Sequence, residues 1–154
     1  MKIMVAFDGT NSSINALNYA LDLKNSADGY LIMYSNTESK VIPPYFGEYS
    51  GDFFNEMVEK DEKTAESLMD MAVQIAKKHG VTPEVEIVDM PGDDTADTIL
   101  KTAYKFKADI IIMGMRRLGR VEKFILGSVS AEVIQHSKIA VLVAAPKNEE
   151  AEKK

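Results

Sequence analysis

Cysteine is absent from this sequence of 154 residues, and its absence removes several kinds of chemistry at once. There can be no disulfide framework, no thiolate metal site and no cysteine nucleophile. The sequence also lacks an apolar stretch of membrane-spanning length, and the apolar run at residues 2–7 is too short for the core of a signal peptide. We therefore expect a cytoplasmic protein with no membrane partner.

Basic residues are outnumbered: 18 Lys and Arg stand against 24 Asp and Glu, giving a net charge of −6 and a pI near 5.0. Nucleic-acid binding needs clustered Lys and Arg to neutralise phosphates, so we expect no nucleic-acid partner. A single anion held by backbone N–H groups is compatible with this charge.

Familiar catalytic patterns are missing as well. The sequence contains no Walker lysine pattern, no Ser–His–Asp order and no carboxylate pair that stands out. His79 and His136 fall near expected helix ends, and neither has a histidine neighbour. We expect no catalytic residues and at most a slow ATPase; a non-enzymatic binding protein fits better.

What the sequence does contain is an alternation of strand-like and helix-like segments. Strands are predicted at residues 2–7, 30–34, 84–88, 109–113 and 139–145. Helical spacing predicts helices after residue 13, from about 54 to a stop at His79-Gly80, around 96–103, and over 127–137. The segment from Ser35 to about Gly51 reads as a loop, and its aromatic residues suggest a lid or a contact surface.

This alternation predicts a three-layer, doubly wound α/β fold with a five-stranded parallel sheet, because parallel strands need helical crossovers. The first and fourth strands are the most apolar and should be central, whereas 84–88 alternates and suits an edge. We expect one domain, residues 1–146, followed by a charged flexible tail, residues 147–154.

Two loops are candidates for a ligand site, because ligands of open parallel sheets bind beyond the carboxyl ends of the central strands. They run from Asp8 to Ser13 and from Gly114 to Ser130. In the second, Gly127 and Ser128 open a helix, whose free N–H groups favour an anion. The alternative is that Ser128 is only a helix cap and Gly114 only a turn residue.

Gly114, Gly127, Ser128 and the strand Ala-Val-Leu-Val at 140–143 together resemble the signature of the universal stress protein family. Residues 5–10, 108–114 and the pair at 92–93 also resemble the family, in order along nearly the whole chain. The resemblance implies a Rossmann-like, adenine nucleotide alpha hydrolase-like fold. It also implies a stress-response regulator that binds ATP or AMP between the two loops.

By this resemblance, Asp8 would lie beside the phosphates or their magnesium ion, which it could hold only with nucleotide present. The adenine would lie near Ser35. The alternative for Asp8 is a cap on the first helix. The residues that we expect to contact nucleotide are Ala6, Phe7, Asp8, Gly9, Thr10, Ser35, Met113, Gly114, Arg116, Arg117, Gly119, Gly127, Ser128, Val129 and Ser130.

One position departs from the family pattern: its second glycine falls at Arg117, and Gly119 does not restore the spacing. The arginine either obstructs the approach to the backbone or pairs with a phosphate. Two functions therefore stay open: a nucleotide-responsive regulator, and a dimeric stress or interaction module without nucleotide. The resemblance also implies a homodimer through the strand from Ile139 to Ala145, an apolar edge that needs covering.

Overall fold

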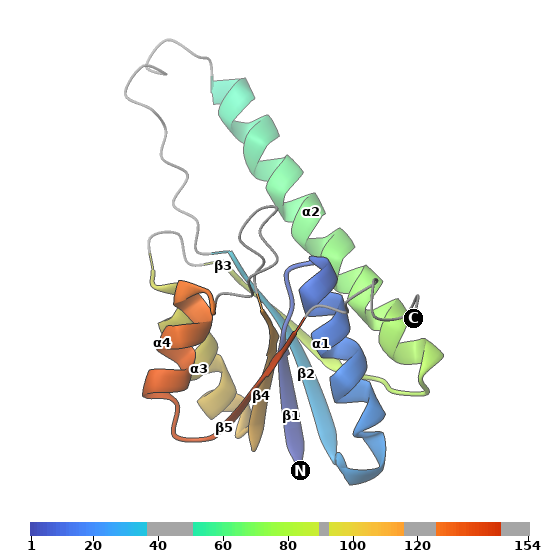
Figure 1. Cartoon of the computed structure of the whole chain (residues 1–154). Coiled ribbons are helices and arrows are strands. Elements are labelled where there is room, and N and C mark those ends of the chain that lie inside the picture. The colour runs from blue at the N-terminus through green and yellow to red at the C-terminus, as the bar shows by residue number, and fades with distance from the viewer. Residues whose placement is uncertain (37–50, 90–92, 116–125, 146–154) are drawn as a thin grey trace, which may run out of the picture.

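The computed structural model describes residues 1–36, 51–89, 93–115 and 126–145, and the side chains of all of these except 51–63. Strands and helices alternate along the chain, as Figure 1 shows. The strands are β1 (Lys2–Ala6), β2 (Gly29–Asn36), β3 (Glu84–Asp89), β4 (Ile110–Gly114) and β5 (Ala140–Ala144). The helices are α1 (Asn11–Asp22), the 3-10 turn η1 (Lys24–Ser26), α2 (Gly51–Lys78), α3 (Thr95–Phe106) and α4 (Ser128–His136).

The five strands form one parallel sheet in the order β3-β2-β1-β4-β5. This confirms the predicted fold class, with β1 and β4 in the interior and β3 at an edge. The chain order reverses between β1 and β4, which is where doubly wound sheets hold ligands. At the carboxyl end of β1, Ala6 is in register with Met33 of β2 and with Met113 of β4.

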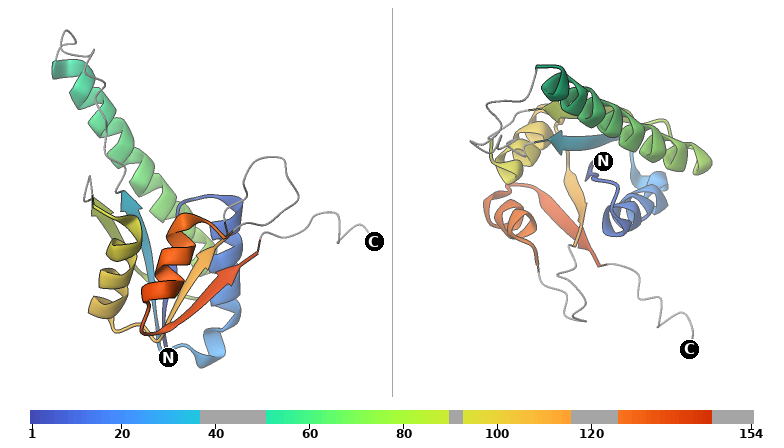
Figure 2. Two further views of the ribbon diagram at one scale, coloured as in Figure 1. Left: turned by 60° about the vertical axis from the view of Figure 1, so that its left-hand side comes forward. Right: turned by 90° about the horizontal axis from the view of Figure 1, so that it is seen from above.

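Helices cover both faces of the sheet, so the fold has three layers (Figures 1 and 2). Alternate residues of β1 point to opposite faces: Ile3 and Val5 join the core beneath α1 and α2, and Met4 joins the core beneath α3 and α4. All three side chains are fully buried. The two-sided burial explains why β1 and β4 read as continuous apolar runs.

Local capping chemistry sets several helix ends. Thr10 caps α1, with its hydroxyl accepting from the N–H of Ser13, and Asp94 caps α3 in the same way through Asp97. Beyond the end of α2, Gly80 has φ +76°, the left-handed conformation that favours glycine after a helix. The predicted stop at His79-Gly80 is thereby confirmed.

Several predicted boundaries were wrong. Helix α1 begins at Asn11 and not after Ser13. Strand β2 runs on to Asn36, because pairing with β3 continues to Asn36 and Asp89 after pairing with β1 has ended at Met33. Ser35 is therefore a strand residue and does not begin a loop. Helix α2 begins at Gly51, earlier than its apolar pattern indicated.

Other expectations fall outside the described residues: the aromatic part of the expected loop, Gly92 and the 147–154 tail. Within the described ranges, no helix is both long and apolar enough to cross a membrane.

Candidate functional site

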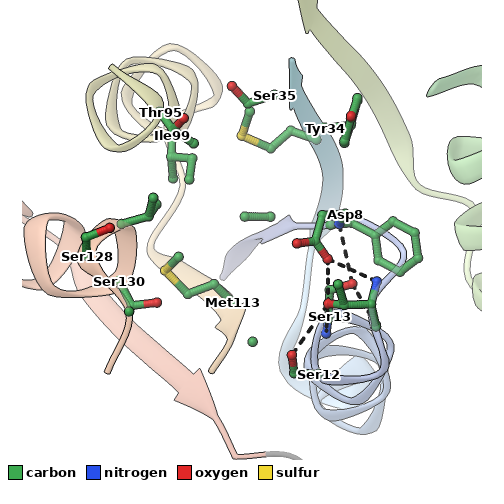
Figure 3. A pocket seen from close by; sticks show the side chains of 17 residues that line it. Asp8, Ser12, Ser13, Tyr34, Ser35, Thr95, Ile99, Met113, Ser128 and Ser130 are labelled. Carbon is green, nitrogen blue, oxygen red and sulfur yellow. Dashed lines mark hydrogen bonds between the residues drawn. The ribbon is translucent and has the colours of Figure 1, made fainter. Parts of the chain in front are cut away.

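A pocket lies at the point where the strand order reverses, beyond the carboxyl ends of β1, β2 and β4 (Figure 3). The first turns of α1, α3 and α4 surround it. It is lined by Ala6, Phe7, Asp8, Thr10, Ser12, Ser13, Met33, Tyr34, Ser35, Thr95, Ile99, Met113, Gly114, Gly127, Ser128, Val129 and Ser130.

Most of the residues that the sequence predicted to contact a nucleotide line this pocket. Those in the lining are Ala6, Phe7, Asp8, Thr10, Ser35, Met113, Gly114, Gly127, Ser128, Val129 and Ser130. Gly9 belongs to the same turn but does not line the pocket; its close neighbour is Leu68 of α2. Arg116, Arg117 and Gly119 lie outside the described residues.

The floor of the pocket is apolar and includes Ala6 of β1. Met33 and Met113 flank this small side chain in register, and Ile99 of α3 belongs to the same cluster. These three larger side chains are nearly fully buried. A short residue between two long thioethers leaves a shallow apolar slot, and polarisable methionine sulfurs suit contact with an aromatic ring.

One wall of the pocket is a hydrogen-bonded turn that includes Asp8, Thr10 and Ser13. Asp8 Oδ1 accepts from the Thr10 amide at 3.0 Å and from the Thr10 hydroxyl at 2.5 Å. The amide of Asp8 in turn donates to Ser13 Oγ at 3.3 Å. The cap of α1 is therefore Thr10, and Asp8 holds that cap in place while its carboxylate stays exposed.

The opposite wall is the N-terminus of α4, where Gly127 occupies the cap position. Within the described part of the chain, no side chain caps this helix. The first turn of a helix has N–H groups without intrahelical partners, and the helix dipole adds partial positive charge there. Ser128, Val129 and Ser130 of this turn line the pocket, and Figure 3 shows Ser128 and Ser130 across from Asp8 and Ser12.

Ser35 contributes a buried hydroxyl at the far end of β2. It lies two residues beyond Met33 and so on the same face of the sheet. Of the buried side-chain oxygen and nitrogen atoms in the described residues, the Oγ of Ser35 alone has no hydrogen-bond partner. A buried polar group without a partner costs free energy, and such groups in native proteins often mark a place for a ligand or a water.

Gly114 has a packing role that the sequence did not indicate. A Cβ at this position would lie 2.5 Å from the carbonyl carbon of Ser12, 2.6 Å from its oxygen and 2.7 Å from the amide nitrogen of Ser13. Glycine is thus required where the end of β4 meets the first turn of α1.

Sequence reasoning missed six lining residues: Ser12, Ser13, Met33, Tyr34, Thr95 and Ile99. Met33 and Tyr34 directly precede Ser35, and Ser12 and Ser13 belong to the segment from Asp8 to Ser13 that was predicted to be a candidate loop. Proximity in sequence could therefore have added these four. Thr95 and Ile99 reach the pocket from α3, on the far side of the sheet from α1, and nothing in their own sequence context signals this.

The described residues contain no group of three or more His, Asp or Glu side chains placed to hold a metal ion. Among the described residues that line the pocket, Asp8 alone carries a carboxylate. A divalent cation there would need phosphate oxygens and water to complete its coordination.

Solved structures show the same fold. A universal stress protein from Archaeoglobus fulgidus has a TM-score of 0.71 and 22% identity, over 94% of this chain and 98% of that chain. A structure of the Archaeoglobus fulgidus protein in complex with dAMP has a TM-score of 0.67 and 21% identity, over 94% and 97% of the two chains. A family protein from Arabidopsis thaliana with AMP bound has a TM-score of 0.66 and 19% identity, over 97% and 94%.

Sequence comparison gives closer relatives. A putative universal stress protein of Staphylococcus haemolyticus is 31% identical over 92% of this chain and 82% of its own length. One from Staphylococcus aureus strain USA300 is 30% identical over 92% and 81%. The family model of the universal stress protein family matches residues 1–145. The chain belongs to the universal stress protein family.

Proposed function

We propose that this protein binds an adenine nucleotide, ATP or AMP, in the pocket at the strand reversal, and that binding makes it a regulator in the stress response. Proteins of the same fold have been solved with dAMP, AMP and cAMP, which supports an adenine nucleotide as the ligand. We further propose that the protein is cytoplasmic and that its single domain spans residues 1–146.

The observation that carries this proposal is the division of the pocket into an apolar floor and two polar walls. The slot over Ala6, between Met33 and Met113, suits a flat aromatic base. The N-terminal turn of α4, from Gly127, suits an anionic phosphate, and the hydroxyls near Asp8 suit a sugar. A nucleotide is a ligand class that presents an aromatic, a hydroxylated and an anionic part in one molecule.

We propose binding without efficient turnover. Hydrolysis would need a group that positions and deprotonates water. Among the described residues that line the pocket, Asp8 alone carries a carboxylate that could do so. Its Oδ1 already accepts two hydrogen bonds from Thr10. Magnesium would enter with the phosphates of ATP and share Asp8 with them.

Calorimetric titration with AMP and ATP, with and without magnesium, tests the proposal. Wild type should bind saturably, and Ala6→Val, which fills the slot, should weaken AMP and adenosine alike. Ala140→Val, at an exposed position of β5, is the matched control and should bind as wild type. Absence of binding by wild type contradicts the proposal.

The second candidate function is a dimeric interaction module that binds no nucleotide. It is favoured by Arg117, which stands where the family pattern that this sequence resembles has its second glycine, so Arg117→Gly belongs in the same titration. If only that variant binds, the pocket can hold a nucleotide and Arg117 prevents binding in the wild-type protein.

Either function is compatible with a homodimer, which we propose to form through β5. The two sheet edges differ in charge: β3 carries Glu84, Glu86 and Asp89, whereas β5 reads Ala-Val-Leu-Val-Ala. Charged residues protect an edge from pairing, and an uncharged apolar edge invites it. Two copies of β5 would pair across a two-fold axis with only uncharged side chains in the interface, whereas two copies of β3 would bring the three acidic residues of each copy into one interface.

A further inference from the structure

We infer that Gly114 and Asn15 are positioning residues, which fix the first turns of α1 between the ends of β4 and β5 and thereby set the position of the pocket wall from Asp8 to Ser13. The inference deepens the proposed function and rests on it only for the effect on ligand affinity. It assigns Gly114 a role other than direct approach to a phosphate.

The first fixed point is the contact between Gly114 and the backbone of α1. The atoms nearest to an added Cβ, at 2.5–2.7 Å, belong to the backbone of Ser12 and Ser13 and not to a side-chain tip that could rotate away. Any larger residue at position 114 must therefore displace the first turn of α1 as a whole. Close packing makes such a displacement costly.

The second fixed point is Asn15, one turn further along α1. This residue is only 7% exposed, and its Nδ2 donates to the carbonyl oxygen of Ala145 at 2.5 Å. The preceding carbonyl, of Ala144, accepts from the amide of Met115 at 2.9 Å. The end of β5 is thus joined both to α1 and to the residue that follows Gly114.

The wall of the pocket follows the position of α1, because hydrogen bonds connect the two. Ser13 Oγ accepts from the Asp8 amide, and the Ser13 amide donates to Thr10 Oγ1. Thr10 donates to Asp8 through both its amide and its hydroxyl. A shift of the first turn therefore moves Asp8, the carboxylate of the described lining, relative to the N-terminus of α4 across the pocket.

Hydrogen exchange on the ligand-free protein tests the inference without any nucleotide. The amides of Ser13 and Ile14 donate to Thr10 in the cap of α1, and those of Asp97 and Thr98 donate to Asp94 in the matching cap of α3. Gly114→Ala and Asn15→Leu should each raise exchange at the first pair roughly tenfold and leave the second pair unchanged.

Thr102→Val is the control variant, because it removes a buried hydrogen bond from Thr102 to Thr98 within α3, away from α1. It should leave exchange at Ser13 and Ile14 as in wild type. Unchanged exchange at these two amides in folded Gly114→Ala or Asn15→Leu protein would overturn the inference. Should Gly114→Ala fail to fold, Asn15→Leu tests the same displacement from a site farther from the ligand.

Affinity for AMP then separates this inference from the proposed function. Both variants should bind AMP roughly tenfold more weakly than wild type. If Gly114→Ala loses AMP affinity while exchange in the α1 cap is unchanged, Gly114 contacts the ligand directly and the positioning role is wrong. If exchange rises as expected but wild type binds no AMP, the positioning role stands and the nucleotide proposal fails.

Discussion

Gly9 packs beneath Leu68, so closely that a Cβ on Gly9 would overlap the Cδ2 methyl group of Leu68. The turn that follows β1 is thereby in contact with α2, although the two segments are some sixty positions apart in sequence. Gly9 also has φ +80°, a left-handed conformation that residues with a Cβ rarely adopt. Its role in the structure is conformational and steric.

Gly9→Ala should therefore lower the free energy of unfolding by about 2 kcal/mol or more, from backbone strain together with the clash against Leu68. Gly80→Ala is the matched control, because Gly80 has φ +76° but no atom within 4 Å of an added Cβ. It should cost about 1 kcal/mol, from backbone strain alone. Denaturant unfolding measures both. Equal costs for the two variants would show that the contact with Leu68 relaxes freely.

Ser35→Ala should change stability and binding in opposite directions. It removes a buried hydroxyl that has no partner among the described residues, so the ligand-free protein should gain about 1 kcal/mol. AMP affinity should fall, since the hydroxyl would be available to the ligand. Thermal unfolding and calorimetry give the two values. Thr102→Val, which loses a hydroxyl that does have a partner, should instead be destabilised. A destabilised Ser35→Ala protein would contradict this interpretation of the hydroxyl.

Ala140→Lys should convert the proposed homodimer into a monomer. Ala140 is exposed at the start of β5, so lysine there puts a charge on the edge without disturbing the core. Val85→Lys makes a comparable change at an exposed position of the other edge strand, β3, and should leave the mass in solution unchanged. Light scattering after size-exclusion chromatography measures both. Loss of the dimer in Val85→Lys and not in Ala140→Lys would assign the interface to β3.

Stability should decline in strongly alkaline solution, in part because of Tyr30. Burial raises the pKa of Tyr30 above its ordinary value of 10.0, and the neutral hydroxyl donates to the Ala20 carbonyl at 2.9 Å. The folded state thus holds this proton more tightly than the unfolded state. The contribution of Tyr30 is complete below pH 10 and is lost as pH rises through the raised pKa.

Urea unfolding of wild type and Tyr30→Phe between pH 8 and pH 11 isolates this effect. The variant lacks the titrating hydroxyl, so its stability should decline less steeply above pH 10. Parallel curves for the two proteins would show that other groups account for the alkaline loss.

The sequence alone determined the architecture, for reasons that act over short distances. Continuous apolar runs identified β1 and β4 as interior strands because both faces of these strands are buried, and the alternating pattern of β3 identified an edge. Turn-forming and capping residues after β1 indicated where a helix would begin. These properties depend on the pattern of neighbouring residues, so one sequence suffices to read them.

The tertiary structure decided what surrounds the pocket and why particular residues are needed. Gly114 is a glycine because α1, about a hundred positions earlier in the sequence, lies against it, and Ser35 is a strand residue because β3 extends the pairing of β2. Ile99 lines the pocket because α3 packs across the other face of the sheet. Each of these facts depends on contacts between segments distant in sequence, and such contacts form only when the sheet has brought the segments together.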